Sequence, residues 1–186
     1  MAKVREAIDD RLRAFLLAQK VFFVGTAPNG PGGHVNISPK GMAGSFAVLD
    51  PLRVAYLDYT GSGAETIAHL RENARIVLMF CAFDGAPTIV RLHGRGEAVL
   101  AGDPRFAELL SHFDAAAGPG LRSIVVVDVG RVSDSCGFAV PRMEYVDDRD
   151  LLLKWAERKG PEELAGYRAT RNAVSLDGLP ALPPGS

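Results

Sequence analysis

The segment RIVLMFCAFDGAPTIVRLHGRGEAVL, residues 75–100, carries the strongest fold signal in the sequence. Two runs rich in β-branched and aromatic residues, 75–83 and 88–100, flank the pair Asp84-Gly85. An Asp-Gly pair between two such runs is a strong signal for a β-hairpin. The segment therefore predicts two consecutive antiparallel strands.

The same pattern recurs on both sides of this hairpin. Residues 21–27 and 34–38 flank a turn that contains Asn29-Gly30, and residues 45–49 and 53–59 are separated by Asp50-Pro51. A long strand is expected over 122–134. Strands joined by hairpins favour a mainly β protein, an antiparallel barrel of about six to eight strands, over a parallel α/β sheet.

Helical patterns lie outside and between these strands. Apolar residues at helical spacing predict an amphipathic helix at about 4–19. Caps and prolines predict further helices at about 63–72, 103–113, 148–159 and 161–171. We expect one domain over residues 1–179 and a disordered tail over 180–186.

Composition excludes several classes of protein. The 186 residues carry a net charge of −1, without the basic excess of a nucleic-acid-binding protein. The longest apolar runs, 76–83 and 124–127, fall far short of the ~20 residues that span a bilayer. The N-terminal residues lack the apolar core of a secretory signal, so we expect a cytoplasmic protein with no membrane partner. The two cysteines form no CxxC pair, and Cys81 is expected to be a buried free thiol.

The stretch YLDYTGSGAETIAHLREN, residues 56–73, combines a strand end, a glycine turn and a helix. A helix N-terminus after a glycine turn is suited to binding phosphate. The dinucleotide fingerprint is incomplete, because Thr66 occupies the third glycine position. Ser62 and Glu65 also match a capping box, in which each side chain accepts the other residue's backbone N–H. Self-capping and an anion site at Gly63, Ala64 and Thr66 both remain open.

Other residues narrow the chemistry. Strand alternation places Arg91, His93, Arg95 and Glu97 on one face, where the arginines are candidate partners for an anion. The four histidines have no metal-ligand spacing, so no metal is expected. No nucleophile with its base is readable, and the catalytic residues stay unknown. A barrel with a candidate phosphate turn and no acid–base constellation favours chemistry supplied by a cofactor.

Three segments carry a resemblance to a known family: HVNISPKG (34–41), YLDYTGSGAETIAHLRENARIVLMF (56–80) and RLHGRGEAV (91–99). They resemble the pyridoxamine 5′-phosphate oxidase-like superfamily of FMN-binding split β-barrels. SCGFAVPRMEY (135–145) and NAVSLDGLP (172–180) resemble one uncharacterised subgroup of it. The resemblance implies a Greek-key split barrel and a homodimer with FMN at the interface.

The resemblance also implies cofactor-binding residues. Asn36 and Ser38, with their strand backbone, would line the flavin ring. The strand end would meet the ring and the ribityl chain, and the turn would approach the phosphate, with two basic residues nearby. These further residues are Asp58, Tyr59 and Thr60 at the strand end, Ser62, Gly63, Ala64 and Thr66 in the turn, and the cations Lys40 and Arg91.

The implied function is an FMN-dependent oxidoreductase that transfers a hydride through the flavin N5 to or from a small molecule. True pyridoxamine phosphate oxidase activity is not expected. Ala64, Glu65 and Thr66 stand where the namesake oxidases carry a Ser-Arg-Lys run, and the substrate-binding C-terminal segment with its Trp and Arg is missing. Two alternatives keep the fold: an oxidoreductase that binds the deazaflavin F420, and a non-catalytic dimeric barrel that binds flavin or another ligand.

Overall fold

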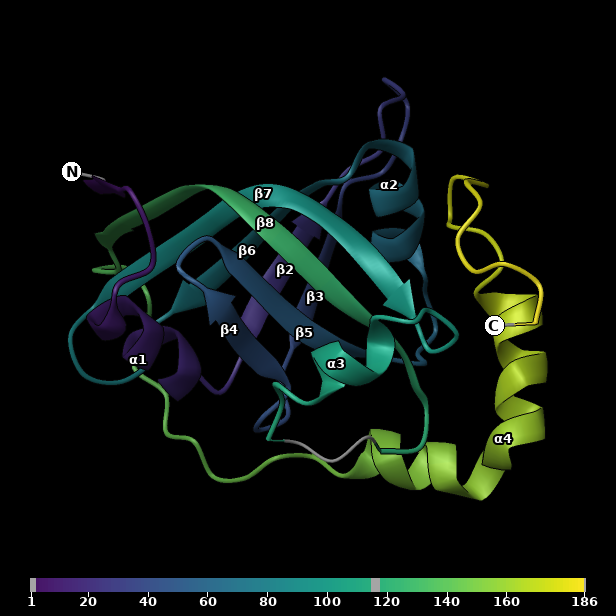
Figure 1. Ribbon diagram of the computed structural model, residues 1–186. Helices are drawn as coiled ribbons and strands as arrows, with labels where there is room; N and C mark the ends of the chain where they lie inside the picture. Colours follow the sequence, from purple (N-terminus) through teal and green to yellow (C-terminus); the bar gives the residue numbers. More distant parts are fainter. Residues whose placement is uncertain (1–2, 115–117, 186) are drawn as a thin grey trace.

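The computed structural model describes residues 3–114 and 118–185 and contains a mainly antiparallel sheet flanked by helices (Figure 1). The strand order is β3-β2-β6-β7-β8-β5-β4, and β1 pairs with β8 outside this path. The sheet curls into the split barrel that the sequence predicts. Its strands, within the described residues, are β1 (Lys3–Arg5), β2 (Phe22–Thr26), β3 (Asn36–Lys40), β4 (Phe46–Asp50), β5 (Arg53–Tyr59), β6 (Arg75–Cys81), β7 (Thr88–Leu100) and β8 (Leu121–Cys136).

The β6–β7 hairpin forms as predicted. Its register runs from Arg75 opposite Arg95 to Cys81 opposite Ile89. Gly85 has φ +70° in the turn, a conformation that glycine adopts without a steric penalty. Cys81 is buried and free, in agreement with the sequence.

The barrel interior is filled by aromatic and β-branched side chains. The rings of Phe22 and Phe80 stack with centroids 5.2 Å apart, and Phe46 packs against both. Tyr56 is completely buried among them. Helix α1 (Asp10–Ala18) buries Leu12 and Leu16 in the same core, so it is a structural cover.

The N-terminal helix is shorter than the predicted 4–19. Val4 pairs with Ser133 in a short strand instead. The helix begins after Asp9, whose side chain accepts the backbone N–H of Leu12 at 2.7 Å. An Asp in extended conformation with this hydrogen bond is an N-cap, which the amphipathic pattern alone does not reveal.

The other helices follow the predicted positions with different ends. They are α2 (Glu65–Asn73), α3 (Phe106–Leu110) and α4 (Leu151–Arg171). The two predicted C-terminal helices are the arms of α4, which kinks at Gly160 (φ 69°, ψ 171°), followed by Pro161. None of the described helices is long and apolar enough to cross a membrane.

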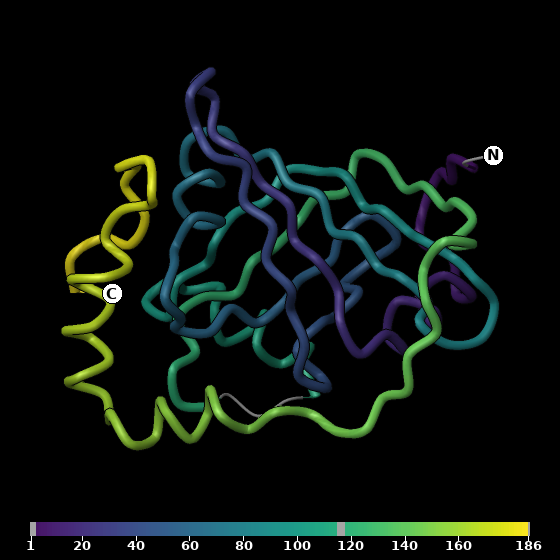
Figure 2. Tube along the Cα trace, turned by 180° about the vertical axis from the view of Figure 1, so that it is seen from behind, coloured from purple at the N-terminus to yellow at the C-terminus, as the bar shows by residue number. Residues whose placement is uncertain are grey.

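The chain after α4 differs from the predicted disordered tail. Ala181 and Leu182 are buried against Ile67 and Ala68 of α2. The segment runs beside α2 in both views (Figures 1 and 2). An Arg71 guanidinium nitrogen donates to the carbonyl of Ala181. The outer face of α2 is apolar, and covering it removes that surface from water.

Candidate functional site

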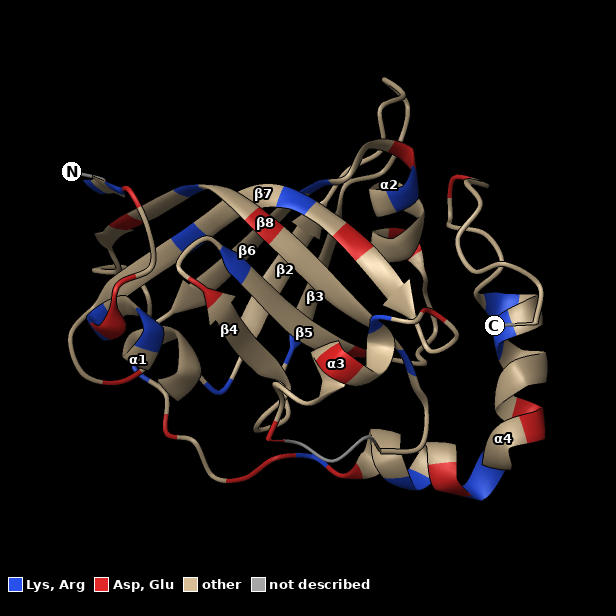
Figure 3. Cartoon of the chain, viewed as in Figure 1, with Lys and Arg blue, Asp and Glu red and all other residues tan. Residues whose placement is uncertain are grey.

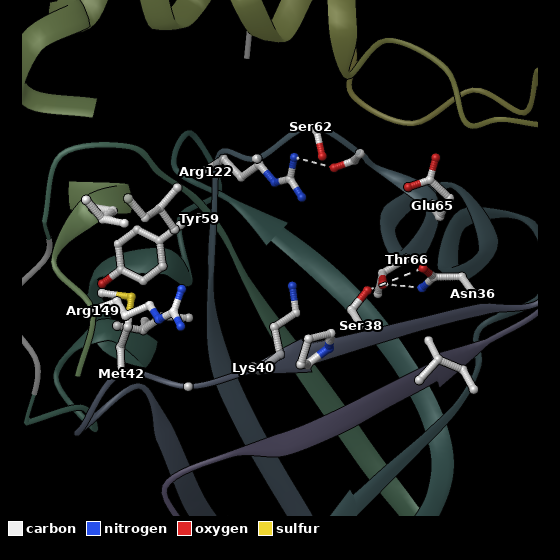
Figure 4. Close-up of a pocket in the computed structure, with 18 residues that line it drawn as sticks. Asn36, Ser38, Lys40, Met42, Tyr59, Ser62, Glu65, Thr66, Arg122 and Arg149 are labelled. Atoms are coloured by element: carbon white, nitrogen blue, oxygen red, sulfur yellow. Dashed lines mark hydrogen bonds between the residues drawn. The ribbon is translucent and has the colours of Figure 1, made fainter. Parts of the chain in front are cut away.

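A cavity of about 600 Å³ opens between edge strand β3, the end of β5, the start of α2 and the start of α4 (Figure 4). This volume is within the range of small-molecule sites. It brings together seven of the predicted binding residues: Asn36, Ser38, Lys40, Tyr59, Ser62, Gly63 and Thr66.

A hydrogen bond from the side-chain amide of Asn36 connects the wall formed by β3 to α2. Asn36 Nδ2 donates to Thr66 Oγ1 at 3.1 Å and to Thr26 Oγ1 at 3.2 Å. Asn36 Oδ1 accepts from Ser38 Oγ at 3.3 Å. Thr26 in turn contacts Nδ1 of the fully buried His69 at 3.0 Å. This network holds the edge strand β3 against α2, whose first turn lines the polar end of the cavity.

A buried ion cluster lies directly beneath the cavity. The carboxylate of Asp58 is 1% exposed and accepts from Arg122 Nε at 2.7 Å, Ser123 Oγ at 3.1 Å and Lys40 Nζ at 3.2 Å. Burial by itself raises the pKa of Asp58, but the charges of Arg122 and Lys40 outweigh it and lower the pKa to about 2. Asp58 is therefore ionised and holds both cations in place.

Arg122 also shapes the glycine turn. Its Nη1 donates to the carbonyl of Gly63 and to Asn172 Oδ1, both at 2.9 Å, while Asn172 Nδ2 donates to the carbonyl of Gly61 at 3.1 Å. Within the described residues, the other terminal nitrogen, Nη2, has only a 3.5 Å contact with Asp58. Arg122 is 6% exposed and lines the cavity, so this nitrogen retains donor capacity toward a ligand.

The predicted capping box is absent. α2 starts at Glu65, and its N-cap residue Ala64 makes no side-chain hydrogen bond. Glu65 Oε1 instead accepts the backbone N–H of Leu176 at 3.2 Å. The carboxylate is occupied by the C-terminal segment, a long-range contact that a local sequence pattern does not contain.

The first turn of α2 therefore keeps unused donors. The first backbone hydrogen bond at this end runs from the N–H of Ala68 to the carbonyl of Ala64. Among the described residues, the N–H groups of Glu65, Thr66 and Ile67 have no acceptor. Such orphan donors, with the positive end of the helix dipole, attract anions.

Four predicted residues do not line the cavity. Asp58 lies beneath it, and Ala64 is buried against the C-terminal segment. The hydroxyl of Thr60 donates to the carbonyl of Gly120 at 2.9 Å. Arg91 on β7 donates to Ser135 Oγ at 3.2 Å, away from this cavity.

Sequence reasoning missed several lining residues. Arg122 lies at the start of β8, just before the apolar run 124–127, and a cation beside a buried apolar run is the signal that marks it. Met42, with Arg149, Leu151 and Leu152 near the start of α4, reaches the cavity through tertiary contacts. Burial raises the pKa of the neighbouring Tyr59, so its phenol stays protonated at neutral pH.

Comparisons with known proteins agree with this architecture. A family model described as pyridoxamine 5′-phosphate oxidase matches residues 8–136, a range that holds every strand from β2 to β8. Pyridoxamine 5′-phosphate oxidase family protein ustO of Aspergillus flavus is 43% identical over 193 residues, which cover 95% of this chain and 76% of that protein.

Two solved structures are similar to this chain at low sequence identity. One is a putative 5-nitroimidazole antibiotic resistance protein from Bacteroides thetaiotaomicron, with a TM-score of 0.52 and 15% identity, covering 72% of this chain and 87% of that chain. Another is an FMN-binding protein from Syntrophomonas wolfei, with a TM-score of 0.49 and 16% identity, covering 64% of this chain and 80% of that chain.

Proposed function

The chain belongs to the pyridoxamine 5′-phosphate oxidase family, and from that premise we propose that it is an FMN-binding oxidoreductase acting on a small molecule. The cavity between β3 and α2 is the proposed flavin site. Bound FMN would supply hydride transfer at its ring. The protein would bind and orient the flavin.

The observation that carries the proposal is the unused hydroxyl donor of Thr66. This residue is 6% exposed, lines the cavity and accepts a hydrogen bond from Asn36. The described residues offer its own hydroxyl proton no acceptor. A buried donor without a partner costs about 1–3 kcal/mol, so a ligand acceptor at this point is favoured.

The groups around Thr66 fit a phosphate. The free N–H groups of Glu65 and Ile67 lie in the same helical turn, and Arg122 Nη2 retains donor capacity at the cavity wall. Arg122 thus supplies a positive charge that the turn itself lacks. We infer that the flavin phosphate binds here, in place of the family's turn cations.

The remaining wall fits the rest of the flavin. β3 offers its backbone along Asn36–Lys40 to the flavin ring. Lys40 Nζ lies 3.2 Å from the Asp58 carboxylate, and a cation at this wall would stabilise negative charge on a ring. The C-terminal segment with its Trp and Arg that binds the substrate in the namesake oxidases is missing from this chain, and this difference supports a substrate other than pyridoxamine phosphate.

We further propose a homodimer. β3 ends the sheet order, and its residue Ile37 is 68% exposed, with Val35 just before it 71% exposed. An exposed apolar edge strand is prone to association, and a second copy would cover it beside the cavity. Light scattering during size-exclusion chromatography tests this, with a dimer mass expected and a monomer mass at working concentration contradicting it.

The flavin proposal is tested by mass spectrometry of ligands that co-purify and by titration of the cofactor-free protein. We expect saturable binding of FMN at micromolar concentration and reoxidation of the bound reduced flavin by an added acceptor. A parallel titration with F420 distinguishes the deazaflavin alternative, which tighter F420 binding would establish. FMN binding without reoxidation by any acceptor would instead favour the non-catalytic barrel.

A further inference from the structure

The cavity has a second end, opposite the start of α2. Figure 4 shows Tyr59, Met42 and Arg149 gathered there. The cavity lining also includes the apolar side chains of Leu57 and Leu152. One guanidinium in an apolar wall is an arrangement that discriminates among ligands by charge.

Among the residues that the structure describes, the Arg149 side chain has no partner, although carboxylates surround it in sequence. Figure 3 shows acidic and basic residues side by side in the segment before α4. Asp148 Oδ2 accepts the N–H of Ala43 at 2.9 Å, and Asp150 pairs with Lys154 at 2.5 Å. Within residues 3–114 and 118–185, no hydrogen bond or ion pair engages the Arg149 side chain, which lines the cavity. Its charge therefore remains available to a ligand.

The backbone at Met42 is a second, independent sign of a built site. Met42 has φ 74°, in the left-handed region that non-glycine residues rarely adopt. The turn that holds it is closed by two hydrogen bonds, from Ser45 Oγ to the carbonyl of Gly41 at 2.7 Å and from the N–H of Ser45 to the carbonyl of Met42 at 3.1 Å. Such conformations persist where surrounding contacts enforce them, commonly at ligand sites.

We propose that Tyr59, Met42 and Arg149 form a subsite for the substrate, a flat apolar molecule that carries one anionic group. Tyr59 and Met42 contact its apolar body, and Arg149 pairs with its anion. The thioether and the phenol ring both suit a planar partner, and a guanidinium binds a carboxylate or phosphate through parallel hydrogen bonds. This inference rests on the proposed function, in which the flavin phosphate occupies the opposite end.

The test uses 2-naphthoate as probe and its neutral amide, 2-naphthamide, as the matched uncharged probe. Both are titrated calorimetrically into the 186-residue chain, with and without FMN. The variants are Arg149→Gln and, as a control from the same segment, Arg142→Gln, whose side chain is 85% exposed and contacts Asp84. Met42→Gly removes the side chain while accepting the positive φ.

We expect one 2-naphthoate to bind per chain. Arg149→Gln should lower the affinity for 2-naphthoate about tenfold, since a charge-assisted pair contributes about 1.4 kcal/mol or more. Arg142→Gln should change the affinity for 2-naphthoate by no more than about twofold. 2-Naphthamide should bind more weakly than 2-naphthoate, and neither arginine substitution should change its affinity. Met42→Gly should lower the affinity for both probes. An unchanged ratio of acid to amide affinity in Arg149→Gln overturns the subsite, as does the absence of saturable acid binding.

The same proteins separate this inference from the flavin proposal. Arg149→Gln is expected to keep the FMN affinity of the unmodified chain, because the phosphate lies at the other end. If FMN fails to bind while 2-naphthoate binds through Arg149, the flavin proposal fails and the subsite stands. If FMN binds and the probe does not, the opposite holds.

Discussion

Asp58→Asn tests the buried ion cluster beneath the cavity. The substitution keeps the shape of the side chain but removes the charge that faces Arg122 at 2.7 Å and Lys40 at 3.2 Å. Asn keeps one acceptor oxygen and sets an amide NH2 group against the donors around it, so the variant removes the charge and one hydrogen-bond acceptor, while Arg122 keeps its contacts with Gly63 and Asn172.

The magnitude follows from the pKa of Asp58. The ordinary value is 3.8 and the folded value is about 2. At about 1.4 kcal/mol per pKa unit, the ionised carboxylate stabilises the fold by about 2 kcal/mol at neutral pH. Because the folded pKa lies below the unfolded one, this stabilisation is complete above 3.8 and is lost as pH falls toward 2.

Urea unfolding at pH 7 and near pH 3 measures this difference. Asp58→Asn should lower the free energy of unfolding by about 2 kcal/mol at pH 7 and by about half as much near pH 3. The control Asp128→Asn removes a carboxylate that is 77% exposed and pairs with Arg53, and it should cost less than about 1 kcal/mol. A difference between Asp58→Asn and the unmodified protein that does not change with pH would show that the Asp58 charge does not stabilise the fold.

Three further substitutions test separate contacts. Thr66→Val should weaken FMN binding about tenfold but change the riboflavin affinity by no more than about twofold. Thr170→Val on α4 should change neither affinity in the same fluorescence titration. Glu65→Gln keeps an acceptor for the N–H of Leu176 but removes the charge beside the phosphate site, so FMN should bind several-fold tighter; an unchanged affinity would place the phosphate elsewhere. Leu182→Ala should lower the free energy of unfolding by about 2–3 kcal/mol in urea, against no measurable change for the exposed Leu176→Ala, and equal stabilities would show that the tail does not pack on α2.

Local signals predicted the sheet well. The Asp84-Gly85 turn and the alternating runs around it identify consecutive antiparallel strands, because hairpin register depends on residues close in sequence. The same signals failed at the N-terminus, where Val4 pairs with the distant Ser133. That pairing is a tertiary contact without a local pattern.

At the site, too, the sequence predicts some features, while tertiary contacts determine others. The cavity brings together the β3 residues and Thr66, and their role in binding a flavin stays a prediction. Glu65 matched a capping box, yet its carboxylate bonds to Leu176, 111 residues away. Arg122 on β8 donates to the carbonyl of Gly63 in the turn and to Asn172. These partners are distant in sequence, so no local pattern predicts the contacts.

The central claim is that the α2 end of the cavity binds the phosphate of FMN. Its most direct test is calorimetric titration of the cofactor-free protein with FMN and with riboflavin, which differ only by that phosphate. The free α2 amides, the Thr66 hydroxyl and Arg122 predict that FMN binds at least about tenfold more tightly than riboflavin. Equal affinities for the two flavins, or no saturable binding of FMN, would contradict it.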